Sequence, residues 1–242
     1  MVKIGFYGSC QLNKPVNVFF REEILKGNNL EIIFNIPFYK YDINDPGYLG
    51  LLDYSIFDNI DMLIIENNKL KCQASSEKII NYCENKKIKI IKTCLLKFPI
   101  YPLNWSGRGE NINDYKNFSS LDEIDYKSKF EKCINSLEKE INKTDLSGGI
   151  VSFITENYNK KLLFTHSLHP TNILLYELYK SILSNLGINI DLYNYNLKKE
   201  IIILWKNPFT SKMMRDLNIS FHTQVSDIFY LERYNKNKYL LE

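Results

Sequence analysis

The chain lacks the sequence signatures of several common protein classes. Its five cysteines include no C-x-x-C pair, and no Cys/His group has the spacing of a zinc finger, so we expect no metal site. It contains no P-loop, and Gly5 and Gly8 do not make G-x-G-x-x-G, which disfavours kinase chemistry and hydride transfer. No apolar run reaches the ~18 residues that suggest a membrane span. We therefore expect no membrane span.

The charge balance and the cysteine usage restrict partners and compartment. Lys and Arg number 31 against 28 Asp and Glu, a formal net charge of +3 that is too small to imply a nucleic-acid partner. The cysteines are odd in number and lie in unrelated contexts, which favours a reducing interior. Met1 leads directly into an apolar strand, without the charged-then-apolar preamble of a signal peptide. These features predict a cytoplasmic protein.

Strand and helix patterns alternate along the chain, which is typical of a parallel sheet covered by helices on both faces. With 242 residues, 45% hydrophobic, the chain can bury one substantial core. We expect an α/β three-layer sandwich with a parallel five-stranded sheet, forming a single domain over residues 1–242 with a helical insertion at about 111–160. The expected strands are 2–7, 30–36, 61–65, 88–93 and 161–165, with a further short one at 201–204. The expected helices are 16–26, 74–85, 120–142, 150–159, 171–186 and 211–217.

The first strand runs into Gly8-Ser9-Cys10-Gln11, the most informative motif of the chain. Ligands of open parallel sheets bind beyond the carboxyl ends of the strands, commonly beside the first strand. A helix that begins here would offer unpaired backbone N–H groups and a partial positive charge, and both favour a thiolate. Cys10 is therefore a candidate nucleophile. The alternative is a small residue that fills a tight turn.

Two of the three histidines, His166 and His169, follow the expected fifth strand. Pro170 restricts the backbone of His169, which suits a fixed general base that deprotonates Cys10 and later reprotonates a leaving group. His166 could orient His169, cap the next helix or have a local role. For each histidine, the alternative is a structural hydrogen bond.

Two further groups could complete such a site. Asn67, after the third expected strand, could donate a hydrogen bond to an oxyanion beside the backbone N–H of Cys10, although a turn-forming role is the alternative. The loop at 96–110 contains a lysine, two aromatic residues and an arginine that could bind a phosphorylated ligand, or else pack as a surface loop. These residues are Lys97, Tyr101, Trp105 and Arg108.

Three blocks of this sequence together resemble the WcbI-like capsular polysaccharide biosynthesis family. They are the turn Gly8-Ser9-Cys10-Gln11, the loop Phe98-Pro99-Ile100-Tyr101-Pro102 with Trp105, and the segment from Leu163 to Leu175 that contains His169-Pro170. The resemblance implies an SGNH-hydrolase-like, flavodoxin-like fold with Cys10 at the nucleophile position and His169 as general base. His166 would stand where the hydrolases have an orienting aspartate, so a hydrolase triad is incomplete.

The same resemblance implies a coenzyme A-binding protein that acetylates a polysaccharide or sugar-linked intermediate in surface glycan biosynthesis. Acetyl-CoA would be the donor and a carbohydrate the acceptor, with possible association with glycan-biosynthesis enzymes. Alternatives are a thiol esterase or deacetylase, and a non-catalytic coenzyme A-binding or glycan-binding subunit. The candidate cofactor-binding residues are Ser9, Gln11, Lys14, Lys97, Tyr101, Trp105 and Arg108.

Overall fold

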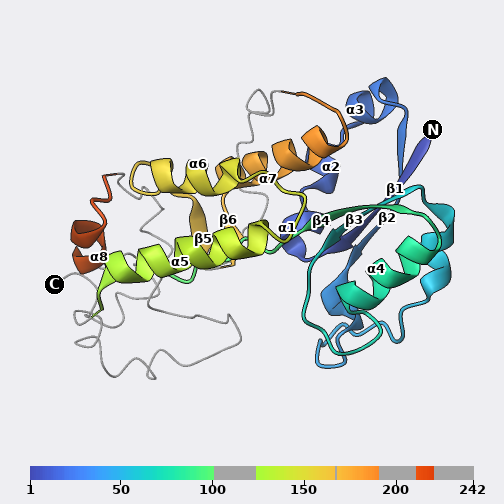
Figure 1. Ribbon diagram of the computed structural model, residues 1–242, viewed down its shortest axis with the longest axis horizontal. Coiled ribbons are helices and arrows are strands. Elements are labelled where there is room, and N and C mark those ends of the chain that lie inside the picture. The colour runs from blue at the N-terminus through green and yellow to red at the C-terminus, as the bar shows by residue number, and fades with distance from the viewer. Residues whose placement is uncertain (101–123, 167, 191–210, 221–242) are drawn as a thin grey trace.

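The structure is a computed structural model that describes residues 1–100, 124–166, 168–190 and 211–220 (Figure 1). Its sheet contains four strands, all parallel, in the order β2-β1-β3-β4. The strands are β1 (Val2–Gly8), β2 (Leu30–Pro37), β3 (Met62–Glu66) and β4 (Lys89–Thr93). The first four predicted strands are thus confirmed, with small shifts at their ends. The strand order reverses between β1 and β3, which is the switch point where such sheets bind ligands.

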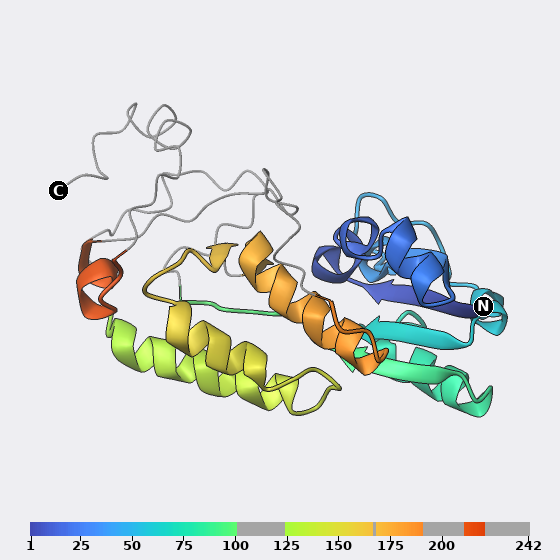
Figure 2. The ribbon, with the colours of Figure 1, turned by 90° about the horizontal axis from the view of Figure 1, so that it is seen from above.

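Helices cover both faces of the sheet, as predicted (Figure 2). On one face, the alternate residues Tyr7, Leu63 and Ile65 pack with α4 (Ser76–Asn85) and the 3-10 helix η2 (Tyr54–Asn59). On the other face, the side chains of Phe6 and Ile64 pack against the short helices that follow β1. Strands buried on both faces explain the continuous apolar runs of β1 and β3.

The single helix predicted over 16–26 is wrong. After the four-residue helix α1 (Cys10–Asn13), this range instead forms two short helices, α2 (Val16–Phe19) and α3 (Glu22–Gly27). Pro15 lacks the N–H that a continuous helix from α1 would need. Phe20 then leaves helical geometry (φ −101°, ψ 64°), and Arg21 is extended (φ −68°, ψ 162°) before α3 begins. The apolar spacing alone did not reveal the break at Phe20 and Arg21.

The prediction that residues 161–165 add a fifth parallel strand is also wrong. These residues lead into β5 (Phe164–His166), which pairs antiparallel with the two-residue strand β6 (His169–Pro170) in a separate small sheet. The outer edge of β4 is instead covered by Asp145, which forms two hydrogen bonds with the backbone of Lys92. The Lys92 N–H donates to Asp145 Oδ2 (2.6 Å), and the Asp145 N–H donates to the Lys92 carbonyl (2.9 Å). The segment predicted at 201–204 lies outside the described residues.

The remaining helices lie to one side of the sheet, with α7 nearest to it (Figures 1 and 2). They are α5 (Tyr126–Ile141), α6 (Gly149–Asn157), α7 (Asn172–Asn185) and α8 (Ser211–Asp216). Gly187 follows α7 with φ 75°, as expected of a helix C-cap glycine. Within the described ranges, no helix is long and apolar enough to cross a membrane.

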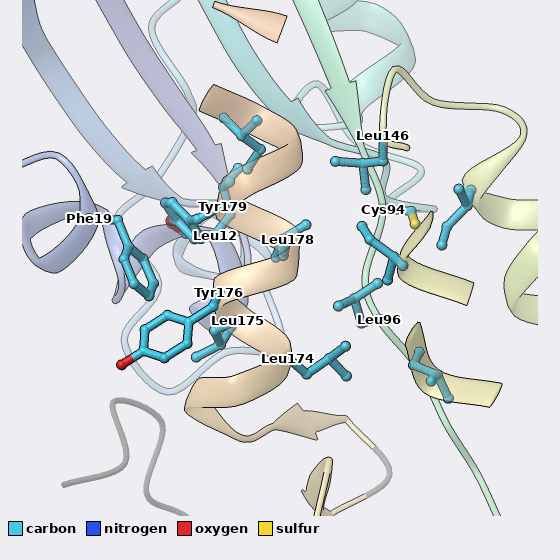
Figure 3. Packing of buried hydrophobic residues seen from close by; sticks show 14 of the residues in the cluster. Leu12, Phe19, Cys94, Leu96, Leu146, Leu174, Leu175, Tyr176, Leu178 and Tyr179 are labelled. Atoms are coloured by element: carbon cyan, nitrogen blue, oxygen red, sulfur yellow. The ribbon is translucent and has the colours of Figure 1, made fainter. Parts of the chain in front are cut away.

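Helix α7 connects the sheet to the outer helices. Tyr179 stacks at a tilt on Phe19, with ring centroids 4.7 Å apart. Figure 3 shows Phe19 and Leu12 on one side of α7, and Cys94, Leu96 and Leu146 on the other. One buried cluster therefore runs from the sheet through α7 to α5, α6 and α8. Helix α7 therefore packs against the end of the sheet where α1 begins.

Candidate active site

Ser9 lies directly after β1 and caps α1, the four-residue helix that presents Cys10. Its Oγ accepts a hydrogen bond from the backbone N–H of Gln11 (3.2 Å) and donates one to Oε2 of Glu66 (2.7 Å). The Ser9 N–H also points to Glu66 Oε2, at 3.4 Å. Serine is a preferred N-cap because its short side chain satisfies an unpaired backbone donor. The turn after β1 is thus bonded to the end of β3.

Gln11 holds the turn to two other loops through its side-chain amide. Its Nε2 donates to the carbonyls of Leu96 (3.0 Å) and Leu168 (2.6 Å), while its Oε1 accepts from the Leu96 N–H (3.0 Å). The residue is 0% exposed. All the hydrogen-bonding groups of this amide are therefore engaged with the backbone after β4 and the backbone between β5 and β6, which gives Gln11 a structural function.

Two other contacts complete the anchoring of α1. Asn13 and Asn35, on α1 and β2, are joined by their side-chain amides, and Asn35 Nδ2 also donates to the Asn13 carbonyl (2.8 Å). The Tyr179 hydroxyl, on α7, donates to the carbonyl of Leu12. Contacts from β2, β3, the loop after β4, the β5–β6 turn and α7 thus converge on α1 and its N-cap Ser9. A helix this short requires such tertiary contacts, because its few internal hydrogen bonds do not offset the cost of nucleation.

Cys10 is half-buried at this converging point, and its pKa is raised above the ordinary thiol value. Burial is the largest cause, and the negative charge of Glu66 adds to it. Lys14 and the backbone N–H groups of Cys10 and Gln11 act in the opposite direction. The sequence-based expectation of a thiolate stabilised by the helix start is therefore corrected. The N–H groups have the expected effect, but desolvation outweighs it.

His169 is half-buried and lies next in sequence to Leu168, whose carbonyl accepts the Gln11 hydrogen bond. Gln11 and Leu168 are joined by this hydrogen bond. Cys10, the predicted nucleophile, is next to Gln11 in the sequence, and His169, the predicted base, is next to Leu168. In the small sheet, the backbone of His169 is in register with that of His166. The Gln11–Leu168 bond thus brings the segments that bear Cys10 and His169 together, although the strand before His169 belongs to the small antiparallel sheet and not to the parallel one.

Glu66 is a site residue that the sequence reasoning missed. It is the last residue of β3 and only 1% exposed, and burial raises the pKa of its carboxyl to about 7. The two hydrogen bonds from Ser9 act in the opposite direction and lower it. A signal was present in the sequence, because an acidic residue directly follows the buried run Leu63-Ile64-Ile65 at the switch point.

Asn67 lies at the same sheet edge but on the other face. Side chains alternate along a strand, so Asn67 follows Leu63 and Ile65 toward α4, whereas Glu66 faces α1. Asn67 lines a polar hollow with Ser76 and other residues of α4, and its N–H donates to the Thr93 carbonyl (2.9 Å). The structure therefore does not bring Asn67 to Cys10.

The predicted cationic residues are only partly described. Lys14 is exposed and close enough to Cys10 for its charge to lower the thiol pKa, and Lys97 is exposed directly after Leu96. Tyr101, Trp105 and Arg108 lie outside the described residues, and only the backbone of His166 is described. Within the described ranges, no cluster of three His, Cys, Asp or Glu residues could hold a metal ion.

The fold and this turn define an α/β protein with a flavodoxin-like strand order and a cysteine at its topological switch point. No family model and no curated protein matches the chain. Among solved structures, the chain is similar to WcbI, described as a novel polysaccharide biosynthesis enzyme, in its native form without a disulfide bond between coenzyme A and a cysteine. The match has a TM-score of 0.65 at 14% identity and covers 97% of this chain and 89% of that one. The chain therefore has a WcbI-like fold.

Proposed function

We propose that this protein is an acyl-CoA-dependent O-acyltransferase that acetylates a hydroxyl of a polysaccharide or sugar-linked intermediate in surface glycan biosynthesis. The observation that carries the proposal is the 2.6 Å hydrogen bond between Gln11 and Leu168, which holds the segments bearing Cys10 and His169 together. WcbI is described as a polysaccharide biosynthesis enzyme in a form without a disulfide bond between coenzyme A and a cysteine, and this description supports the same choice of donor.

In the proposed first step, His169 takes the proton of the Cys10 thiol, since the raised pKa of Cys10 makes the thiol its resting form. The Cys10 sulfur attacks the thioester carbonyl, and the carbon–sulfur bond to coenzyme A breaks. The departing coenzyme A thiolate takes the proton from His169, which leaves an acyl thioester on Cys10. The backbone N–H of Cys10 is the proposed oxyanion donor.

In the second step, the acceptor hydroxyl attacks the acyl-Cys10 carbonyl while His169 accepts the hydroxyl proton. The bond between the acyl carbon and the Cys10 sulfur breaks, and the thiolate recovers the proton from His169. The products are the acylated sugar and the original thiol, so neither step needs another reactant. In the proposed mechanism, one histidine thus accepts and returns a single proton in each step.

For coenzyme A binding, we assign the phosphates to the exposed cations Lys14 and Lys97, because charge-assisted contacts suit phosphate oxygens. Arg108, Tyr101 and Trp105 remain the proposed partners from the following loop. Ser9 and Gln11 are reassigned from cofactor contact to positioning of Cys10, since their side chains are bonded to Glu66 and to backbone groups.

A second candidate is a non-catalytic coenzyme A-binding or glycan-binding subunit. The raised pKa of Cys10 favours it, because a protonated thiol is a poor nucleophile. A third reading, a thiol esterase or deacetylase, uses the same residues with water as the acceptor.

The test measures coenzyme A release from acetyl-CoA with a panel of sugar acceptors. Cys10→Ala and His169→Ala should abolish transfer and retain coenzyme A binding, and Cys72→Ala, at an exposed cysteine, should behave as wild type. Full transfer by Cys10→Ala contradicts covalent catalysis. Acetate release without an acceptor supports a thiol esterase, and binding without turnover across the panel supports a non-catalytic subunit.

A further inference from the structure

The carboxyl group of Glu66 is buried, and among the described residues only one of its two oxygens accepts hydrogen bonds. Its Oε2 accepts the hydrogen bonds of Ser9, whereas the buried Oε1 has no hydrogen-bond partner within the described ranges. The ion pairs of the described residues do not include Glu66. A buried acid without a cation is unfavourable in its charged form, and an amide or apolar residue would avoid that penalty. Its presence at the switch point calls for a functional explanation.

The charge of Glu66 acts on acidic groups in three other segments of the chain. It raises the pKa of Cys10 on α1, of Cys94 after β4, and of Tyr179 on α7. Burial raises the pKa of Cys94 to about 12 and that of Tyr179 well above its ordinary value, so both stay protonated near neutral pH. Cys10 is therefore the neighbouring acid whose ionisation competes with that of Glu66.

The groups on the other side of Cys10 have different effects. Lys14 lowers the pKa of Cys10, and the Tyr39 hydroxyl, whose own pKa burial raises, is near enough to sense the Cys10 charge. His169 adjoins the Gln11–Leu168 bond and is the proton acceptor in the proposed reaction. Glu66 is thus a negatively charged group that disfavours ionisation of the Cys10 thiol, and its carboxyl is hydrogen-bonded to Ser9 in the same turn.

We propose that Glu66 is a positioning residue that holds the Cys10 turn through Ser9 and that, by gaining or losing its own proton, controls how readily the Cys10 thiol ionises. With Glu66 protonated, its hydrogen-bonded link to the turn persists and the opposing charge is gone. With Glu66 ionised, a second negative charge on Cys10 is disfavoured. The site therefore favours a single negative charge, on either Glu66 or Cys10.

This inference rests on the proposed function only in taking Cys10 as the reactive group, and alkylation tests it without any turnover. The full chain is treated with iodoacetamide from pH 6 to pH 10, and the labelled peptides of Cys10 and Cys72 are quantified by mass spectrometry. Cys72 is exposed and serves as an internal reference. Glu66→Gln retains an oxygen that can accept the Ser9 hydrogen bond while it removes the charge.

In Glu66→Gln, the alkylation profile of Cys10 should move to lower pH, with about three- to tenfold faster labelling at pH 8, as a shift of about half to one pKa unit produces. Labelling of Cys72 should not change. The matched control Glu77→Gln removes a charge from an exposed residue of α4, on the opposite face, and should leave Cys10 unaffected. An unchanged Cys10 profile in folded Glu66→Gln overturns the proposal. If that variant does not fold, Glu66→Met provides the same readout.

The two proposals fail differently. A shifted alkylation profile together with full acyl transfer by Cys10→Ala would contradict the covalent acyltransferase and leave the charge control by Glu66 intact. Loss of transfer in Cys10→Ala together with an unshifted Glu66→Gln profile would contradict the charge control alone.

Discussion

Gln11 Nε2 and the Leu168 carbonyl lie 2.6 Å apart, and this bond joins two segments separated by 157 residues. On one side it adjoins Cys10, and on the other it adjoins His169. The same amide pairs with both backbone groups of Leu96, so the turn after β1, the loop after β4 and the β5–β6 turn meet at one buried side chain. The geometry of the candidate site depends on this residue more than on the short helix that carries the cysteine.

Gln11→Ala should destabilise the fold by about 3 kcal/mol, because three hydrogen bonds are lost and buried Leu96 groups are left unsatisfied. Urea unfolding measures the change. The matched control is Gln73→Ala, since the buried Nε2 of Gln73 has no hydrogen-bond partner in the described ranges. An equal loss of stability in both variants would show that the Gln11 contacts are not special.

The stability of the protein should fall as pH rises through about 7, because of Glu66. The pKa of its carboxyl is raised from 4.5 to about 7 in the folded state. Below pH 4.5 the carboxyl is protonated in both the folded and the unfolded state, and the contribution of Glu66 to stability is fully present. Between pH 4.5 and about 7 the carboxyl ionises in the unfolded state but stays protonated in the folded state. The free energy of unfolding therefore decreases over this range. The total loss is about 3 kcal/mol. Denaturant titrations across this range should show the slope in the wild type and a much smaller one in Glu66→Gln, and equal slopes would contradict it.

Ser9→Ala should move that pH dependence to higher pH. The hydrogen bond from the Ser9 hydroxyl lowers the pKa of Glu66, so its loss raises that pKa further, while the bond from the backbone N–H remains. The lost cap costs about 1 kcal/mol. Ser75→Ala is the matched control, because Ser75 caps α4 by accepting the Lys78 N–H (3.3 Å). Both variants should lose stability in unfolding experiments. A shift of the pH profile in both, or in neither, would contradict the link between Ser9 and Glu66.

Asp145→Ala should expose the edge of β4. The Lys92 N–H would lose its 2.6 Å acceptor, so its hydrogen exchange should accelerate at least tenfold, with a stability loss of about 1 to 2 kcal/mol. Hydrogen exchange read by NMR measures the change at Lys92. Persistent protection of that amide would mean that another group covers the edge.

Much of the fold could be predicted from apolar runs and helical spacing. Four parallel strands, the C-cap at Gly187 and the position of Cys10 at the sheet edge followed from local patterns. The break at Phe20 was missed because the apolar spacing continues across it. The antiparallel pairing of β5 was missed because a short apolar run does not specify its partner.

The site divides in the same way. Cys10 and His169 were predicted because their residue types suggest chemistry, and Gln11 was predicted as a cofactor contact although its amide is bonded to backbone groups. Glu66 was missed because its importance depends on a hydrogen bond to Ser9 across neighbouring strands, at 2.7 Å. Asn67, one residue later, points to the other face, a difference that strand alternation alone could have revealed.

In the proposed reaction, Cys10 carries the acyl group between coenzyme A and a sugar. The most direct measurement is a single-turnover reaction of the full chain with radiolabelled acetyl-CoA, followed by peptide mapping before and after addition of the acceptor. We expect label on the Cys10 peptide that is lost to the acceptor, and no label in Cys10→Ala. Transfer to the acceptor with no label on Cys10, and at an undiminished rate in Cys10→Ala, would contradict it.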